Sequence, residues 1–305
     1  MNTTPINRPA AGIGYAVIAM ALFSAMDAVG KWLVADFSTF QVLALRGLFS
    51  IVLLLPFLLR GTGIVGVLRT RNLKGQILRS LLGVGAMFGF FSALRYLPLA
   101  DATAIGFSGS LFMAALSVPL LGERVGMRRW AAILVGFGGV LIIVQPGSSA
   151  FQLASLLVLL SALLYALMMI ATRWLSRTES NVSMVLYHSL VATVIGVAAL
   201  PFVWISPDLV EWGLFAVMGI FATLAHLALA QAFRLAPVAV VGPFEYSTLL
   251  WATIIGFLVW QEVPGPNVWY GSALLVAAGI FILYRETKIA SDARKVLRDA
   301  ARSGD

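Results

Sequence analysis

The sequence contains no cysteine, only two histidines and few charged residues, which make up 11% of its 305 positions. The absence of cysteine excludes disulfides, thiolate catalysis and thiolate metal sites. Two histidines are too few for a histidine-rich metal centre, so we expect neither a metal nor a cofactor. Soluble domains average about 25% charged residues, and the low charge content therefore argues against a water-soluble protein.

Apolar residues dominate instead, at 60% of the chain, and the mean hydropathy is +0.95. The net charge is +8, but the basic residues fall between long apolar runs, which is typical of membrane loops. A helix needs about 20 mostly apolar residues to cross the hydrocarbon core of a bilayer. We therefore predict an all-α integral membrane protein with ten transmembrane helices. They are expected at residues 11–35, 40–59, 76–96, 101–121, 128–145, 151–173, 182–204, 211–233, 238–260 and 268–285.

The first apolar run is longer than the core of a signal peptide, so we interpret it as an uncleaved first helix. With the N-terminus in the cytoplasm, 18 of the 21 basic residues fall on the cytoplasmic side, and only Lys31, Arg46 and Arg95 do not. Because positively charged loops stay in the cytoplasm, this predicts a bacterial-type inner (plasma) membrane protein with both termini cytoplasmic. The opposite connections carry acidic residues, namely Asp36, Asp101, Asp208, Glu211 and Glu262.

The two halves of the chain resemble each other at a constant offset. Ala93–Pro98 (ALRYLP) is echoed by Ala232–Pro237 (AFRLAP), at an offset of 139. A weaker echo relates Lys31-Trp32 to Arg173-Trp174, at an offset of 142. The offset of 139 also relates Ser108 to Ser247, Glu123 to Glu262, Gly126 to Gly265 and Trp130 to Trp269.

These echoes predict two five-helix repeats, at residues 11–145 and 146–285. They are flanked by a cytoplasmic N-terminal segment, 1–10, and by a cytoplasmic tail, 286–305, for which we expect a solvated or membrane-surface helix. An odd number of spans makes the second repeat enter the bilayer upside down relative to the first. Inverted repeats recur in secondary transporters, with the substrate site near the midplane at the repeat interface. The sequence therefore predicts a transporter that works by alternating access.

Several motifs resemble those of the drug/metabolite transporter superfamily, in its ten-helix EamA branch. They are Leu43–Arg46 (LALR), Ala93–Tyr96 (ALRY), Leu121–Arg124 (LGER), Gly138-Gly139, Gln261-Glu262 and Ala278-Gly279. The resemblance covers residues 11 to 285. It implies a central cavity surrounded by helices 1, 3, 4, 6, 8 and 9, and gradient-linked or facilitated transport of small metabolites.

Members of this family include exporters of aromatic and neutral amino acids and importers of riboflavin or S-adenosylmethionine. The resemblance favours the aromatic amino-acid exporter type, and we expect export of aromatic and other neutral amino acids. An importer of a vitamin or nucleoside-like metabolite is the alternative. The expected partners are the small-molecule substrate, the lipid bilayer and, as a candidate coupling ion, the proton. No nucleic acid is expected, and a monomer and a homodimer are both open.

Charged side chains inside the predicted helices are candidates for function, because a charge at the bilayer centre costs at least ~2.5–3.5 kcal/mol on insertion scales. Asp27 and Lys31 lie four residues apart on one helix face. They either form an ion pair, or Asp27 is a substrate-ammonium or proton site. Arg46 matches the helix-2 arginine of the family, and we expect a structural role, paired with an acid or with helix-end carbonyls.

Glu245 is the leading candidate for substrate recognition. It follows Pro243, which removes a helical hydrogen bond and can leave a carbonyl open, and its repeat counterpart is Gly106. The carboxylate therefore breaks the symmetry of the scaffold, and it could bind an amino group or change protonation during transport. His226 could hydrogen-bond substrate or relay protons; the alternative is a satisfied packing residue.

Aromatic residues in the expected cavity helices could form a pocket around the substrate, and ordinary packing or lipid contact is the alternative. These residues are Phe88, Phe91, Tyr165, Tyr246 and Trp251. Gly85 and Gly89 have the GxxxG spacing that lets helix backbones approach closely, and they could provide a sliding contact.

A rival interpretation is a rhomboid-like intramembrane serine protease, since Gly106–Gly109 (GFSG) fits the GxSG pattern with Ser108 as the nucleophile. Catalysis would need a base within hydrogen-bond reach of this serine, for which His226 is the candidate. Ser108 has a repeat partner in Ser247, which indicates a scaffold residue, and rhomboid-like chains lack a five-helix duplication. We therefore predict that the protein is not an enzyme.

Overall fold

The computed structural model describes residues 8–60, 69–122, 126–147, 152–175, 178–236 and 238–303, and every regular element among them is helical. The first half contains α1 (Pro9–Asp36), α2 (Thr39–Arg60), α4 (Leu73–Leu94), α5 (Leu99–Gly106), α6 (Ser108–Leu121) and α7 (Met127–Val144). The second half contains α8 (Leu153–Leu175), α9 (Asn181–Val203), α10 (Leu209–Leu235), α11 (Val238–Val241), the 3-10 helix η1 (Gly242–Tyr246), α12 (Ser247–Trp260) and α13 (Pro266–Ser303).

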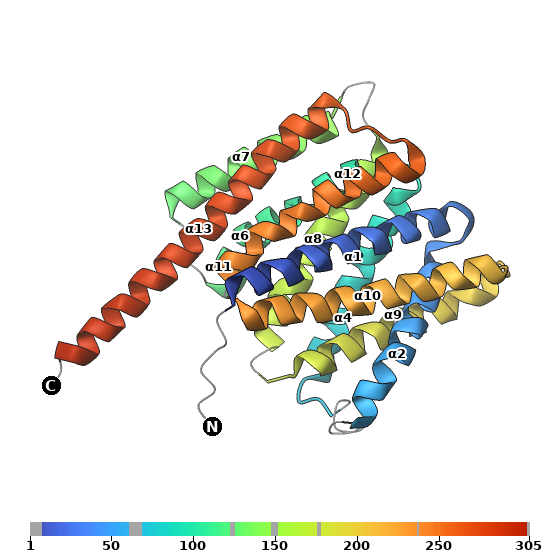
Figure 1. The fold of residues 1–305 in the computed structure, drawn as a ribbon, viewed down its shortest axis with the longest axis horizontal. Coiled ribbons are helices and arrows are strands. Elements are labelled where there is room, and N and C mark those ends of the chain that lie inside the picture. Colours follow the sequence, from blue (N-terminus) through green and yellow to red (C-terminus); the bar gives the residue numbers. More distant parts are fainter. Residues whose placement is uncertain are drawn as a thin grey trace.

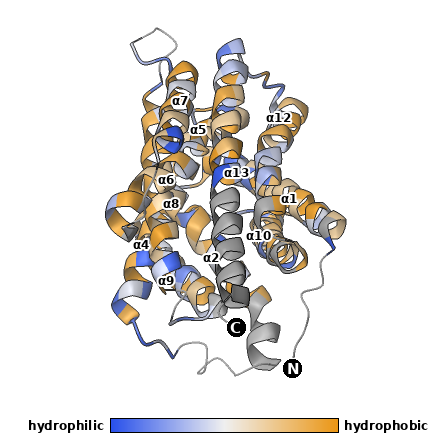
Figure 2. Ribbon diagram, turned by 90° about the vertical axis from the view of Figure 1, so that its left-hand side faces the viewer, coloured by the Kyte–Doolittle hydropathy of each residue, from blue (hydrophilic) through white to orange (hydrophobic). Residues whose placement is uncertain are grey.

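Nine helical stretches of the described residues are long and apolar enough to cross a membrane, and α2 adds a shorter apolar stretch, Thr39–Leu53. The fourth span consists of α5 and α6 in line, and the ninth consists of α11, η1 and α12. Large apolar side chains stay exposed along the spans, such as Leu134 (68%) and Leu258 (67%), as lipid contact requires. Figure 2 shows hydrophobic residues along most of the helix lengths. The predicted all-α membrane fold is confirmed.

Spans four and nine are interrupted at equivalent positions. Phe107 separates α5 from α6, and Tyr246, at the offset of 139, is the last residue of η1 before α12. Each broken span also ends at a residue with left-handed backbone, Gly122 (φ 69°) and Gln261 (φ 57°), which are related by the same offset. The irregularities of the main chain thus recur at the offset of the sequence motifs, which extends the repeat to the backbone.

The helix packing has the pattern of an inverted repeat. α1 packs along α10 as α4 packs along α8, and α1 meets α12 as α8 meets α6. Exchanging the two repeats converts each of these pairs into the other. The exchange leaves two pairs unchanged, α2 with α9 and α7 with α13, and Figure 1 shows them along opposite sides of the bundle. Spans 1, 3, 4, 6, 8 and 9 lie between these two flanking pairs.

Glycines bring α7 and α13 close together. A Cβ atom at Gly139 would lie 2.6 Å from the carbonyl oxygen of Gly271, so a larger side chain there requires a backbone shift. Small residues permit this approach between membrane helices. Beyond the contact, α13 continues as one helix to Ser303, so residues 286–303 are helical and extend away from the bundle in Figure 1.

Glu179, in the connection between α8 and α9, caps the N-terminus of α4. Its Oε1 accepts hydrogen bonds from the backbone N–H groups of Arg71 (2.9 Å) and Asn72 (3.1 Å). Desolvation acts to raise the pKa of Glu179, but these bonds and those from Thr70 and Gln76 hold the pKa below its ordinary value of 4.5. The carboxylate therefore ties the α8–α9 connection to the start of α4.

Candidate functional site

The two ends of the bundle differ in charge. Asp36, Asp101, Asp208 and Glu262 lie at the end where α1, α4 and α12 finish, which we call the acidic end. The opposite end, where α1, α4 and α11 begin, is called the basic end because Arg71, Lys74 and Arg173 belong to it.

One group of polar side chains lies inside the bundle between α1, α2, α4 and α9. Arg46 on α2 donates from Nη1 to the thioether sulfur of Met87 on α4, 3.0 Å away. Nε2 of His188 on α9 lies 3.4 Å from the same sulfur. Asp27 on α1 attracts Arg46 electrostatically. We call these four residues the arginine cluster.

Arg46 has far fewer partners than its chemistry allows. A guanidinium group has five N–H donors. Among the described residues, Arg46 has no carboxylate within 4.0 Å, and its buried Nε has no hydrogen-bond partner. The sequence predicted pairing with an acid or with helix-end carbonyls; Asp27 attracts Arg46 from more than 4.0 Å away, and the hydrogen bond that Arg46 makes within the described chain is to a thioether, which is a weak acceptor. Arg46 therefore keeps donors that can bind an anion.

Arg79 shows how a structural arginine inside this bundle is satisfied. Its Nε donates to the hydroxyl of Thr172 at 2.6 Å, and its Nη1 donates to the carbonyl oxygen of Met184 at 3.0 Å. These bonds link α4 to α8 and α9. The contrast with Arg46 shows that the scaffold can pair a buried guanidinium with oxygen acceptors where it serves packing.

A second group lies around the breaks in spans four and nine. Glu245, in η1, is exposed, and it interacts electrostatically with Tyr165 on α8, which is 48% exposed. The neighbouring Tyr246 packs its ring 4.9 Å from the ring of Phe107, at the break between α5 and α6. We call Phe107, Tyr165, Glu245 and Tyr246 the tyrosine cluster. η1 packs against α1, α11, α12 and α13, whereas α8 packs mainly against α4 and α6, so Tyr165 and Glu245 belong to different groups of helices.

The helix break after Pro243 leaves carbonyl groups that side chains satisfy. The hydroxyl of Ser247 donates to the carbonyl oxygen of Phe244 at 2.6 Å, and that of Thr248 donates to the carbonyl oxygen of Glu245 at 2.6 Å. The proline was predicted to leave a backbone carbonyl open, but nearby hydroxyl groups bond to the carbonyl oxygens at this break. This leaves the Glu245 carboxylate, and not an open carbonyl, as the polar group that can meet a solute.

His226 on α10 interacts with the arginine cluster. Its Nδ1 lies 2.7 Å from the carbonyl oxygen of Ala222, and its ring stands edge-on to that of Phe23, with centroids 5.0 Å apart. The side chain is exposed, and it interacts electrostatically with Arg46 and His188. These contacts fix the position of Nδ1 and place the ring within electrostatic reach of the arginine cluster.

Several residues in and around the two clusters are related to one another by the offsets of the repeat. Arg46 and His188 are related by the offset of 142 that also relates Lys31 to Arg173, and so are Phe23 and Tyr165. Met87 and His226 are related by the offset of 139, as Gly106 and Glu245 are. Sequence reasoning found only the last pair, and it missed Met87. Extending the offset of 142 from helix 1 to helix 2 would have revealed the pair of Arg46 and His188.

Lys31 closes the acidic end and does not pair with Asp27. Its ammonium group forms an ion pair with Glu262 and donates to the carbonyl oxygen of Leu97 at 3.0 Å. Glu262 also accepts from the backbone N–H of Leu99 at 3.0 Å, and Lys31 lies 4.9 Å from the ring centre of Trp260. The network joins α1, the α4–α5 connection and the end of α12. Glu262 was noted in the sequence only as a loop acid and a repeat partner.

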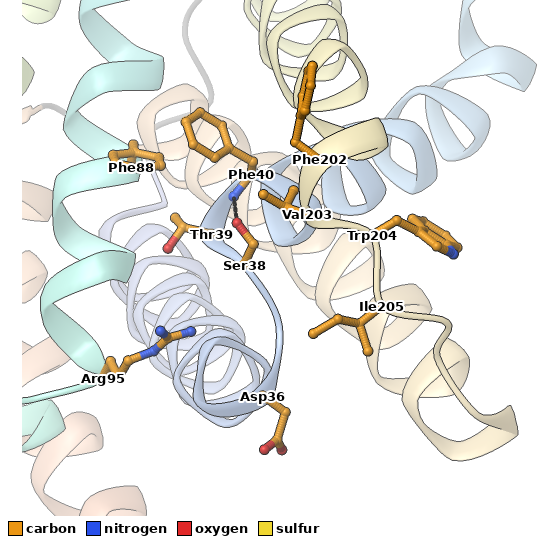
Figure 3. Close-up of a pocket in the computed structure, with 10 residues that line it drawn as sticks. All are labelled: Asp36, Ser38, Thr39, Phe40, Phe88, Arg95, Phe202, Val203, Trp204 and Ile205. Atoms are coloured by element: carbon orange, nitrogen blue, oxygen red, sulfur yellow. Dashed lines mark hydrogen bonds between the residues drawn. The ribbon is translucent and has the colours of Figure 1, made fainter.

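Phe88 lies outside both clusters. It lines a pocket of about 520 Å³ at the acidic end, where its ring packs 4.6 Å from that of Phe40. Figure 3 shows this pocket between the α1–α2 connection, the end of α4 and the end of α9. Arg95, on the pocket wall, donates to the carbonyl oxygens of Val34 (2.6 Å) and Phe37 (3.0 Å) and so caps α1.

The remaining candidates are placed as follows. Phe91 is 2% exposed and belongs to the packed core, and the buried indole N–H of Trp251 has no partner in the described part of the chain. Gly85 and Gly89 face α8, where Ser161 donates to the carbonyl oxygen of Ala86 at 2.5 Å. Ser108 Oγ is buried, and no described residue, His226 included, bonds to it. No group of acidic and histidine side chains in the described ranges could hold a metal ion.

Comparison with known proteins gives a consistent result. The model of the EamA-like transporter family matches residues 10–145 and 152–285. The chain is 30% identical to an S-adenosylmethionine uptake transporter of Rickettsia bellii, over 92% of this chain and 96% of that protein. It is 32% identical to a riboflavin transporter of Vibrio cholerae (92% and 96%) and 30% identical to a pseudopaline exporter of Pseudomonas aeruginosa (88% and 94%). A crystal structure with 20% identity shares the fold, with a TM-score of 0.62 over 90% of this chain and 98% of that one.

Proposed function

The chain belongs to the EamA-like transporter family, and on that premise we propose that it is a secondary transporter of an amphoteric metabolite, namely an amino acid or an amino-acid derivative. One observation carries this proposal: the interior holds an arginine without a strong acceptor, and Glu245 has no basic partner within 4.0 Å among the described residues. A solute with one anionic and one cationic group would compensate both. Neither group would then remain uncompensated in a low-dielectric interior.

The same geometry supports a direction of opening. We assign the basic end to the cytoplasm, because basic loops stay on that side. The network of Lys31 and Glu262 holds the acidic end together, whereas Tyr165 and Glu245 are exposed. These features support a conformation that admits solute from the cytoplasm. Alternating access then requires the Lys31–Glu262 network at the acidic end to open while the basic end closes.

Two substrate classes are candidates. One is an aromatic or other neutral amino acid moving outward, and the other is S-adenosylmethionine moving inward. Similarity over nearly the full length to S-adenosylmethionine uptake transporters favours the second. Riboflavin is a further candidate because of the relative in Vibrio cholerae, and the aromatic rings of the tyrosine cluster suit it. Riboflavin has no carboxylate and no amino group of an amino acid, so it would leave Arg46 and Asp27 without new partners.

The test is uptake into proteoliposomes that contain only this protein. Radiolabelled S-adenosylmethionine, tyrosine, leucine and riboflavin are offered at equal concentration. We expect saturable flux of at least one amino-acid-type substrate. Glu245→Gln should lower kcat/KM for a substrate with a cationic group by about ten- to a hundredfold, since a hydrogen bond to a charged group contributes roughly 1.5–3 kcal/mol.

The matched control is Asp36→Asn, at an exposed acid outside both clusters. It should leave flux unchanged. Absence of saturable flux for all four solutes would contradict the proposed function. Unchanged flux and selectivity in Glu245→Gln would remove Glu245 from the site while leaving the transporter assignment intact.

A further inference from the structure

We infer that the arginine cluster binds the head group of an α-amino acid, with Arg46 on the carboxylate and Asp27 on the ammonium group. The inference rests on the proposed transport of an amphoteric metabolite and narrows its substrate to α-amino acids. It also reverses the structural role that the sequence suggested for Arg46.

Arg46 and Asp27 interact electrostatically without forming an ion pair. They attract each other, but their charged atoms lie more than 4.0 Å apart. α2 packs mainly against α9 and α10 and only weakly against α1. Two polar atoms on the α2–α9 side are buried without a partner in the described chain, Nε of Arg46 and Nδ1 of His188. The unpartnered atoms of Arg46 and His188 and the carboxylate of Asp27 are therefore available to a head group.

Charge balance favours a zwitterion over a simple amine or acid. The ionised side chains of Asp27 and Arg46 sum to zero, and a zwitterionic head adds no net charge to them. Each charge of the head group meets an opposite charge of the protein, so no group loses its partner. An amine without a carboxylate would take Asp27 and leave Arg46 uncompensated inside the bundle, which is the costly case for a buried ion pair.

The distance between the clusters selects the length of the substrate. Arg46 lies seven residues from the acidic end of α2, and Glu245 lies fifteen residues from the same end of α12. At 1.5 Å per residue, the two residues differ by about 12 Å in their distance from that end, measured along their own helices. A small amino acid in the arginine cluster would not reach Glu245. An α-amino acid with a long, planar and positively charged side chain would place its charge at Glu245 and its ring among Phe107, Tyr165 and Tyr246.

S-adenosylmethionine has this combination of groups. Its methionine part carries the amino-acid head, its sulfonium carries one positive charge, and its adenine ring is planar. With Asp27, Arg46 and Glu245 ionised, the three side chains sum to one negative charge, which the net positive charge of the bound molecule balances.

The residues proposed to bind the head group are not duplicated in the second repeat. At the offset of 142, the counterpart of Arg46 is His188 and the counterpart of Asp27 is Met169. A second head-group site is therefore absent at the equivalent position of the other half, which lies within the described residues. The substrate therefore keeps its amino-acid head group toward the acidic end throughout the transport cycle.

The experiment compares ligands that differ only in the carboxylate. Binding of S-adenosylmethionine and of decarboxylated S-adenosylmethionine to the purified full-length protein is measured by calorimetry, together with tyrosine against tyramine. We expect the wild type to bind the carboxylate form about ten- to a hundredfold more tightly in the pair that it recognises. Arg46→Gln should abolish this preference, and Arg46→Lys should keep part of it, because lysine retains the charge but not the planar fork.

Arg79→Gln is the matched control, because Arg79 is also an arginine inside the bundle but its donors are occupied by protein oxygens. It is expected to lower the unfolding temperature and to keep the carboxylate preference. If the wild type binds both members of each pair equally, or binds riboflavin alone, the head-group inference is overturned while the transporter assignment stands. If the wild type neither binds nor transports any of these solutes, the proposed function fails instead. The wild-type comparison needs no variant to fold.

Discussion

Breaking the ion pair at the acidic end should open that end of the bundle. Lys31 and Glu262 are only 10% and 22% exposed, and each also bonds the α4–α5 connection. Exposed ion pairs contribute about 0–1 kcal/mol, whereas leaving one partner of a fully buried pair costs about 3–5 kcal/mol. Lys31→Met lies between these cases, and we expect it to destabilise the closed end by about 2 kcal/mol, which corresponds to an opening equilibrium about 30-fold larger.

The absence of native cysteine makes the opening measurable with one introduced thiol. Thr103 is 8% exposed on α5, and its hydroxyl donates to the carbonyl oxygen of Leu99 at 2.8 Å, next to the bond that Glu262 accepts. In a Thr103→Cys background, Lys31→Met should accelerate labelling by a membrane-impermeant maleimide by up to the same factor. Glu262→Gln should act in the same direction.

A double-mutant cycle separates this network from general destabilisation. The double variant Lys31→Met/Glu262→Gln should be labelled no faster than the single variant with the higher labelling rate, because both substitutions remove the same interaction. Lys74→Met, at an exposed lysine of the basic end, is the control and should leave the labelling rate unchanged. An unchanged rate in Lys31→Met would refute the reasoning that this ion pair holds the acidic end closed.

Two further predictions concern the scaffold. Because the folded-state pKa of Glu179 is below its ordinary value of 4.5, the stabilisation it provides is complete above about pH 4.5 and is lost as the pH falls toward the folded-state pKa. The unfolding temperature of Glu179→Gln should therefore depend less on pH below that value than the wild-type temperature does, and equal slopes would contradict the capping role. Gly139→Ala should destabilise by about 1–3 kcal/mol, because its Cβ would meet the Gly271 carbonyl. Gly138→Ala, with no atom near its Cβ, should be neutral in the same thermal assay, and equal effects of the two would contradict the close α7–α13 contact.

The fold could be predicted from the sequence because its main signals are local. Apolar runs of bilayer length locate the spans, and the constant offset of paired motifs reveals the repeat. The break at Phe107 was not predicted from the sequence. At the other break, Pro243 predicted the loss of a helical hydrogen bond, but not that a 3-10 helix forms there with the hydroxyls of Ser247 and Thr248 bonded to its carbonyl oxygens.

The side chains that face the interior were harder to predict than the helices that carry them. In a helix surrounded by lipid, apolar residues occur on every face, so periodicity does not distinguish the interior from the exterior. Phe88 and Phe91 have helical spacing suited to a cavity, yet one lines a pocket at the acidic end and the other is in the core. Ion partners were equally hidden, because Lys31 pairs with Glu262, 231 residues away, and not with Asp27 on its own helix.

The repeat itself points to the functional residues more directly than their chemistry does. A duplicated bundle begins with the same side chain at both positions of each pair, and packing alone gives no reason for the two to diverge in charge. Arg46 opposite His188 and Glu245 opposite Gly106 are pairs in which one half carries a charge that the other lacks. An asymmetric solute that must bind in one orientation requires such differences, since a symmetric lining would accept it equally well in both. We therefore propose that polar residues that break the repeat inside the spans determine selectivity.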